Sequence, residues 1–374
     1  MLITRESVKL SVMAAACALG MTSSAGQDQL LLAVVEFDGL PAGVNLLDPA
    51  TGAVLGEFVA PDFDNNGMLL PVEAISAGPA RSVLFAQPGG DGKVSRYDEN
   101  GVFIQTFIGG TPDPNPVDNI RGMTVIGDFL ITSDWDDTND IHRFILADGS
   151  PDGLGGDPLG TLVFGSQAAP GLGQPQAIEA RGNVDLLVGD IARRRIVRYN
   201  PLTGTRLGDL STVEMTASVT DIDWAPDGSH MVTAEDGSGD RVRLFSAAGT
   251  LLNEFGFNGP EGVHRLADGN YLVTSGSSFG QGKGLFRVSP NGTILATIDD
   301  SRSYGPIELV TLIGGGCNPA DLAPPFGVLD LADLQAFVIA FIGMDPAADL
   351  APPAGVFDLA DLSAYVSEFL AGCP

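Results

Sequence analysis

The sequence predicts a mainly β protein, a six-bladed β-propeller followed by a small α-helical module. Glycine-containing hairpins recur along the body at intervals of 43 to 55 residues, ending at Gly52, Gly101, Gly149, Gly204, Gly249 and Gly292. Four short strands and their loops occupy such an interval. The 49 glycines and 25 prolines also suit many strands joined by tight turns.

Five of these hairpins follow a pair of predicted strands, as in QAIEARG with DLLVGD and GVHRLADG with NYLVTSG. The first hairpin has only LLLAVVE before it, while a spare strand, 307–313 (IELVTLI), follows the last complete unit. We predict that 307–313 pairs beside 30–36 and closes the ring, because closure removes exposed sheet edges.

The segments QPQAIEARGNVDLLVGDIARRRIVRYNPLTG and GPEGVHRLADGNYLVTSG resemble the NHL and gluconolactonase-like group of six-bladed propellers. The segment DIDWAPDGSHMVTA is similar to TolB and WD40 blades. The resemblance covers most of residues 27–314. It implies a blade fold and no particular chemistry, because alternating Val, Ile and Leu are core positions in any propeller.

Residues 1–25 have the pattern of a secretory signal peptide, with Arg5 and Lys9 before an apolar run and small residues at its end. We therefore expect a mature propeller over 26–314 that is secreted, extracellular or held at the cell surface. Cys17 leaves a lipoprotein alternative open, although Ala14 replaces the usual Leu three positions before it. No other stretch approaches about 18 apolar residues, so no transmembrane segment is expected.

The formal net charge of −28 disfavours nucleic acid and anionic membrane surfaces as partners. Cations are the plausible counterparts.

The composition changes at residues 317–374, where two copies of one motif are spaced by 28 residues. The copies are ADLAPPFGVLDLADLQAFVIAF from Ala320 and ADLAPPAGVFDLADLSAYVSEF from Ala348. Each predicts a loop followed by an amphipathic helix. We expect the two helices to bury on each other the faces that carry Leu331, Leu334, Phe337, Val338 and Phe341, and Leu359, Leu362, Tyr365, Val366 and Phe369.

This duplication resembles type I dockerin repeats, and more closely the GC-type dockerin-like domain of secreted bacterial proteins. The resemblance implies a cohesin-like or other cell-surface protein as partner of 317–374. It also implies EF-hand-like Ca²⁺ loops. The matching acids are Asp321, Asp330 and Asp333 in the first loop and Asp349, Asp358 and Asp361 in the second.

The loops depart from the dockerin pattern, because loop positions 3 and 5 fall on Ala323 and Pro325 and their repeat mates, and each loop is one residue too long. Any Ca²⁺ binding is therefore expected to be weak. The alternative is that Asp330 and Asp358 are helix N-caps in a capping-box-like arrangement that needs no metal.

Cys317 and Cys373 lie in matching Gly-Cys contexts at the two ends of this module. In a chain bound for an oxidising compartment, this position predicts a disulfide.

Three polar groups in the body could also bind ligands. The residues Asp62, Asp64, Asn66, Gly67 and Glu73 fit the EF-hand spacing, although Pro71 excludes a regular entering helix and a polar inter-blade loop is the alternative. The acidic run 133–140 (SDWDDTND) is expected to be a solvated hairpin rather than a cation site. The run 193–195 (RRR) is expected to be a hairpin tip rather than a site for a carboxylate-bearing partner.

The catalytic inventory is thin, because His142, His230 and His264 have no metal-ligand partner at readable spacing and the body carries no recognisable nucleophile motif. We therefore favour a secreted or cell-surface binding or display protein, with an unidentified propeller ligand, tethered through the C-terminal module. The alternative is a metal-dependent lactonase-type hydrolase or lyase. Three or four convergent carboxylate or amide side chains in the centre of the propeller would favour the enzyme.

Overall fold

A computed structural model describes most of the propeller and much of the C-terminal module. The described residues are 29–35, 42–59, 72, 74–79, 81–87, 93–109, 119–135, 139–165, 172–181, 185–210, 218–225, 228–237, 239–276, 283–312, 320–322, 329–343, 348, 350–351 and 356–372. The chain divides into the body Gln29–Ile313 and a second unit that includes Gly314–Pro374.

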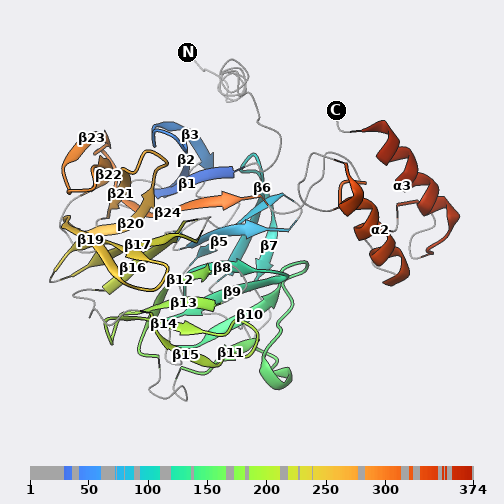
Figure 1. Ribbon diagram of the computed structural model, residues 1–374, viewed down its shortest axis with the longest axis horizontal. Coiled ribbons are helices and arrows are strands. Elements are labelled where there is room, and N and C mark those ends of the chain that lie inside the picture. The colour runs from blue at the N-terminus through green and yellow to red at the C-terminus, as the bar shows by residue number, and fades with distance from the viewer. Residues whose placement is uncertain are drawn as a thin grey trace, which may run out of the picture. The chain divides into compact units, whose positions relative to one another are not determined.

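The body consists of six four-stranded antiparallel sheets, the blades of a propeller (Figure 1). From the innermost strand outward, the first blade contains β24 (Tyr304–Thr311), β1 (Gln29–Val35), β2 (Gly43–Leu47) and β3 (Val54–Val59). The second contains β4 (Ala74–Gly78), β5 (Ser82–Gln87), β6 (Lys93–Asp98) and β7 (Phe103–Ile108). The third contains β8 (Ile120–Ile126), β9 (Phe129–Asp134), β10 (Ile141–Ile145) and β11 (Thr161–Val163).

The other three blades follow the same order. The fourth contains β12 (Pro175–Arg181), β13 (Asp185–Asp190), β14 (Arg195–Tyr199) and β15 (Arg206–Asp209). The fifth contains β16 (Ser218–Trp224), β17 (His230–Asp236), β18 (Arg241–Ser246) and β19 (Leu251–Gly256). The sixth contains β20 (Pro260–Arg265), β21 (Tyr271–Ser275), β22 (Gly284–Val288) and β23 (Ile294–Asp299). A 3-10 turn, η1 (Leu154–Gly156), precedes β11. The predicted six-bladed fold is confirmed.

The predicted ring closure is also confirmed. The last strand of the body, β24, pairs antiparallel with β1, with Leu31 opposite Leu309 and Leu30 opposite Val310. The first blade therefore takes its innermost strand from the end of the body, which satisfies backbone groups that an open ring would expose.

Apolar side chains fill the spaces between neighbouring blades. Phe58 of the first blade contacts Phe85 of the second, with ring centroids 6.2 Å apart, and Phe85 contacts Tyr97 at 5.2 Å. The hairpin glycines allow this close packing: Gly101 has a φ of 76°, and a Cβ there would lie 1.8 Å from the carbonyl oxygen of Phe58. Glycine is required at such a position for both reasons.

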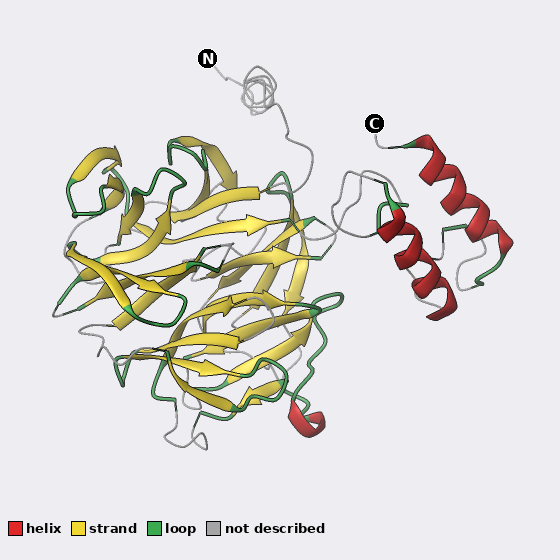
Figure 2. Cartoon of the chain, in the orientation of Figure 1, coloured by secondary structure: helices red, strands yellow, loops and turns green. Residues whose placement is uncertain are grey.

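The C-terminal unit contains α2 (Leu331–Gly343) and α3 (Leu359–Ala371), which Figure 2 shows as helices in an otherwise strand-rich chain. Its core is formed mainly by aromatic side chains, and Phe337 stacks on Tyr365 with centroids 4.0 Å apart. Among the described residues, no helix is both long and apolar enough to cross a membrane.

The predicted burial of the helix faces is only partly correct. Phe337 and Tyr365 are buried, whereas Leu331, Leu334 and Val338 are exposed. The repeat mates of these exposed residues, Leu359, Leu362 and Val366, are exposed as well. The aromatic rings pack with the small Ala320 and Ala348 in the core of the module, and the aliphatic half of each face lies outside this core.

Candidate functional site

Six polar side chains occupy the same position in the six innermost strands. Each lies opposite an aliphatic residue of the second strand of its blade. In blade order, the pairs are Glu308 with Leu32, Ser76 with Leu84, Thr124 with Ile131, Glu179 with Leu187, Asp223 with Val232 and His264 with Leu272. We call the six polar residues the axial ring, because consecutive innermost strands contact one another around the propeller axis.

Polar contacts link neighbouring members of the axial ring. The Thr124 hydroxyl donates to Oε2 of Glu179 at 3.4 Å. Nδ1 of His264 lies 3.4 Å from Oδ2 of Asp223, and that carboxylate also accepts the backbone N–H of Arg265. These contacts span blade boundaries, so the ring side chains are positioned by two blades at once.

Asp221 adds a fourth carboxyl group close to the ring. It is 8% exposed, and its Oδ2 accepts the backbone N–H of Val263 in the next blade at 2.8 Å. Burial, and to a smaller extent the charge of Asp223, raise the pKa of Asp221 to about 7. This carboxyl group is therefore partly protonated at neutral pH.

Two carboxyl groups of the ring, those of Glu179 and Glu308, also resist ionisation. Burial, followed by the charges of Asp223 and Asp221, raises the pKa of Glu179 well above its ordinary value. Burial, followed by the charge of Glu179, does the same to the pKa of Glu308. Because these two residues belong to opposite blades, their interaction reaches across the propeller axis. Burial lowers the pKa of His264, but Asp223 more than compensates and leaves it raised.

The acidic groups therefore converge, as the enzyme alternative requires, but they do not form a ready-made metal centre. Within the part of the chain that the structure describes, no group of three or more His, Cys, Asp or Glu side chains could hold a metal ion. The arrangement can attract a positive charge, donate a proton from a carboxyl group, or do both.

In both copies of the C-terminal repeat, an acid in the first helical turn accepts two backbone N–H groups. Asp333 accepts the backbone N–H groups of Leu322 and Asp330, at 2.7 and 2.8 Å. Asp361 accepts those of Ala351 and Asp358, at 2.8 and 2.9 Å.

Asp358 is the N-cap of α3, in a reciprocal capping box with Asp361. The hydrogen bonds from the backbone lower the pKa of Asp361, that of Asp358 foremost. Asp321 is buried and Asp330 half-buried beside Asp333. The capping alternative thus accounts for Asp333, Asp358 and Asp361, and Ca²⁺ binding stays a prediction.

Several predicted residues lie outside the described part of the chain. They are Asp62, Asp64, Asn66 and Glu73 of the EF-hand-like match, Asp349 of the second loop, and both cysteines, Cys317 and Cys373.

We expected the acidic run 133–140 to be a solvated hairpin, and this expectation is wrong at the two ends of the run. Asp134 and Asp140 are buried, because each accepts a backbone N–H: that of Asn119 at 3.2 Å and that of Gly165 at 2.7 Å. The Asp134 carboxylate also faces His142, with Oδ2 3.9 Å from Nε2. These acids fix loop backbone within the third blade.

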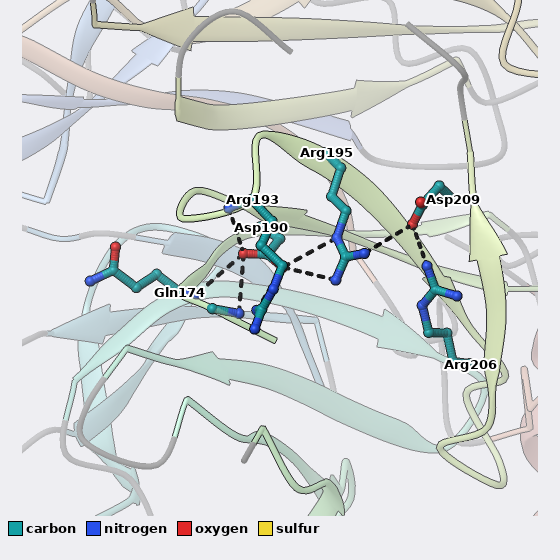
Figure 3. A network of polar contacts seen from close by, with 7 residues as sticks. Gln174, Asp190, Arg193, Arg195, Arg206 and Asp209 are labelled. Carbon is teal, nitrogen blue, oxygen red and sulfur yellow. Dashed lines mark hydrogen bonds and ion pairs between the residues drawn. The ribbon is translucent and has the colours of Figure 1, made fainter. Parts of the chain in front are cut away.

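The arginine run lies at the turn between β13 and β14, as predicted (Figure 3). Arg193 and Arg195 both pair with the fully buried carboxylate of Asp190, at 3.4 and 3.3 Å. Arg195 also reaches Asp209, which pairs with Arg206 at 2.6 Å. These ion pairs are all within the fourth blade, so Arg193 and Arg195 stabilise the hairpin.

Sequence reasoning missed the axial ring, although aligning the blades would have found it. Superimposing VEAISAG, GMTVIG, QAIEARG, DIDW, GVHR and PIELV places a polar residue at the same column of all six strands. A polar residue in the middle of every innermost strand indicates a shared position at the axis.

Comparisons with known proteins support the fold alone. No family model matches the chain, and no curated protein matches it. A chain of a nidogen–laminin complex is similar at a TM-score of 0.56 and 12% identity, over 77% of this chain and 100% of that one. A protein of unknown function from Bacteroides caccae is similar at a TM-score of 0.51 and 11% identity, over 77% of this chain and 100% of that one. A candidate 6-phosphogluconolactonase from Bacteroides fragilis has a TM-score of 0.49 and 12% identity, over 77% of this chain and 99% of that one.

Proposed function

We propose that this protein is an exported binding protein whose propeller takes a cationic ligand at the axial ring and whose dockerin-like C-terminal module attaches it to a protein at the cell surface. The observation that carries the proposal for the propeller is the convergence of Glu179, Asp223 and Glu308 with the nearby Asp221. Burial, together with the repulsion among these groups, raises the pKa values of Glu179, Asp221 and Glu308.

A bound cation would relieve this repulsion. Each carboxyl group would then ionise more readily, because a nearby positive charge favours the charged form of an acid. The net charge of −28 adds a long-range attraction for cations. The pair Asp223–His264 would orient one side of the site, while the Thr124 hydroxyl holds Glu179 on the other.

The tether is supported by two matching stripes of exposed aliphatic side chains on the C-terminal helices. The stripe on α2 is Leu331, Leu334, Val338 and Ile342, and the stripe on α3 is Leu359, Leu362, Val366 and Leu370. Leu331 is 66% exposed and Leu359 is 80% exposed. Contiguous apolar surface of this kind marks protein interaction sites. The proposal also includes export through the predicted signal peptide and, in the C-terminal module, the predicted disulfide and weak Ca²⁺ binding in the loops.

Calorimetric titration of the full mature chain with CaCl₂ and with the diamine putrescine tests the axial site. We expect one of these cations to bind, and Glu308→Gln to weaken binding about tenfold, which corresponds to about 1.4 kcal/mol. Asp128→Asn is the matched control, because it removes one negative charge at the exposed turn between β8 and β9. Equal losses in both variants, or no binding of either cation, would contradict the proposal.

The tether is tested by deleting residues 317–374 and measuring how much propeller remains on the cell surface. Loss of surface retention with unchanged cation binding at the axial ring is the expected result. Unchanged retention would refute the tether, and loss of cation binding would refute the independence of the propeller site.

The second candidate function is a metal-dependent lactonase-type hydrolase or lyase, and the convergence of carboxyl groups at the axis favours it. Hydrolysis of glucono-δ-lactone by the full chain, with and without added CaCl₂, separates the two candidates. Cation binding without turnover supports the binding protein. Turnover that requires the metal and is lost in Glu308→Gln supports the enzyme.

A further inference from the structure

A buried polar cluster lies on one face of the third blade, and none of its members belongs to the axial ring. Strands β9 and β10 are neighbours in this blade (Figure 1), and their register places His142 directly opposite Thr132. Asp134 follows Thr132 by two residues, and side chains two residues apart in a strand lie on the same face. All three residues are buried. An imidazole, a carboxylate and a hydroxyl therefore face the same buried space.

The surroundings of this cluster are apolar. Leu130 and Phe144 alternate with Thr132 and His142 on the same face of the sheet, and they pack with apolar side chains of the second blade, among them Leu84. A medium of low polarity strengthens the attraction between a cation and a carboxylate. An ion bound to the cluster would therefore be held more strongly than one at an exposed site.

One hydrogen bond determines which ring nitrogen of His142 carries the proton. Nδ1 lies 3.1 Å from the carbonyl oxygen of Leu159. A carbonyl oxygen only accepts, so Nδ1 donates, and the neutral ring has its lone pair on Nε2. Among the described residues, Nε2 has no hydrogen-bond partner, although the residue is only 3% exposed. Histidines that bind metals have this arrangement, in which one nitrogen donates to a carbonyl or carboxylate and the other binds the ion.

The other two members of the cluster supply oxygen atoms. Oδ2 of Asp134 lies 3.9 Å from Nε2 of His142, which is too long for a hydrogen bond. Bonds from Zn²⁺ to imidazole nitrogen and carboxylate oxygen are about 2.0–2.2 Å long, so one ion between these two atoms can contact both. Within the part of the chain that the structure describes, the buried Oγ1 of Thr132 also has no hydrogen-bond partner. Oδ1 of Asp134 accepts the backbone N–H of Asn119 at 3.2 Å, which holds the carboxylate in place.

We propose that this cluster binds a divalent transition-metal ion of the Zn²⁺ type, with Nε2 of His142 and Oδ2 of Asp134 as ligands and the Thr132 hydroxyl as a further oxygen beside the ion. An imidazole ligand favours such ions over Ca²⁺, which takes six to eight oxygen ligands. The bound ion would fasten β9 to β10 within the third blade. This site is separate from the axial ring and does not depend on cation binding there.

The variant His142→Asn removes Nε2 from the site. Its side-chain amide can still donate to the carbonyl oxygen of Leu159, so the hydrogen bond that orients the residue is kept. The matched control is His230→Asn, which makes the same change in β17 of the fifth blade.

NMR of the full mature chain with ¹⁵N-labelled histidine shows directly which imidazole binds the ion, because the chain has only three histidines. We expect ZnCl₂ to shift the ring signals of one histidine, which are absent from His142→Asn and present in His230→Asn. In calorimetric titration with ZnCl₂, His142→Asn should weaken binding at least about tenfold. His230→Asn should leave the affinity within about twofold, because it is distant from the site. We expect CaCl₂ to leave the His142 signals unshifted.

Unchanged His142 signals in ZnCl₂ would overturn the proposal and would indicate a buried water that satisfies the same three atoms. Shifts confined to His264, or equal affinities of the two asparagine variants, would overturn it as well.

If circular dichroism shows that His142→Asn does not fold, Asp134→Asn takes its place. This variant keeps an oxygen acceptor for the backbone N–H of Asn119 and should weaken Zn²⁺ binding, whereas an unchanged affinity would overturn the proposal. Glu308→Gln should leave the zinc-induced shift of His142 intact, so failure of this site and failure of the proposed function are distinguishable.

Discussion

The rings of Phe337 and Tyr365 stack with an interplanar angle of 16° and centroids 4.0 Å apart. The two residues occupy the same position in the two 28-residue copies, so the duplication of the sequence is also a pairing in space. Each ring continues to a second aromatic residue of its own helix, Phe341 and Phe369. These four rings, which belong to the two predicted helix faces, form an aromatic spine, whereas the aliphatic residues of the same faces are exposed.

Replacing Phe337 by leucine should destabilise the C-terminal module by about 2 kcal/mol, because it removes a buried ring and its stacking contact with Tyr365. Thermal unfolding followed at 222 nm measures this, since the helices lie in the module and the propeller is β. The control is Val338→Ala, at a neighbouring exposed position, which should change stability by less than about 0.5 kcal/mol. Similar losses for both variants would contradict the aromatic core.

Asp361→Ala should lower the helix signal of the module, at a cost of about 1–2 kcal/mol. Its carboxylate accepts two backbone N–H groups, and both would lose this hydrogen-bond acceptor in the variant. Asp361→Asn keeps an oxygen acceptor and should recover part of the loss. An Asp361→Ala variant as stable as the parent chain would rule out the capping role.

Calcium should bind the module weakly, with a Kd on the order of 10⁻⁴ M or higher. Asp333 and Asp361 already accept backbone hydrogen bonds, and alanine and proline stand at two of the ligand positions. Titration of the full chain and of the Glu308→Gln variant separates loop binding from axial binding. Submicromolar affinity that survives Glu308→Gln would contradict this prediction.

Glu308→Gln should stabilise the propeller more at pH 8 than at pH 4. The folded state raises the pKa of Glu308, so the folded chain holds a proton that the unfolded chain releases above about pH 4.3. The free energy of unfolding therefore falls as the pH rises from about 4 through the folded pKa, and the variant lacks this contribution. Urea unfolding at both pH values should show a difference on the order of 1 kcal/mol. A variant that follows the parent at both pH values would refute the axial repulsion.

Thiol counting on the mature chain tests the predicted bond between Cys317 and Cys373. We expect no free thiol under denaturing, non-reducing conditions. On the chain-entropy model, such a bond would stabilise the module by about 4 kcal/mol. Two free thiols would exclude it.

The sequence was sufficient to predict the closure of the ring but not the axial ring or the aromatic spine. The spare strand at 307–313 had only one vacant place, the innermost position of the first blade, and β24 occupies it. Glu179, Asp223 and Glu308 are far apart in sequence, and only strand register shows that they are equivalent. Helical periodicity groups Leu334 with Phe337, but only the packing between the two helices determines that Phe337 is buried and Leu334 exposed.

The pairing of β1 with β24 also sets the order in which the protein can fold. Gln29 and Thr311 are 282 residues apart and are joined by a side-chain hydrogen bond at 3.2 Å. Contacts of such long sequence separation are slow to form, because the loop entropy is lost before the contact is gained. The first blade, although it is made first, is therefore completed last, and a chain interrupted before residue 304 keeps an exposed strand edge on β1 that a chaperone or a second chain can cover.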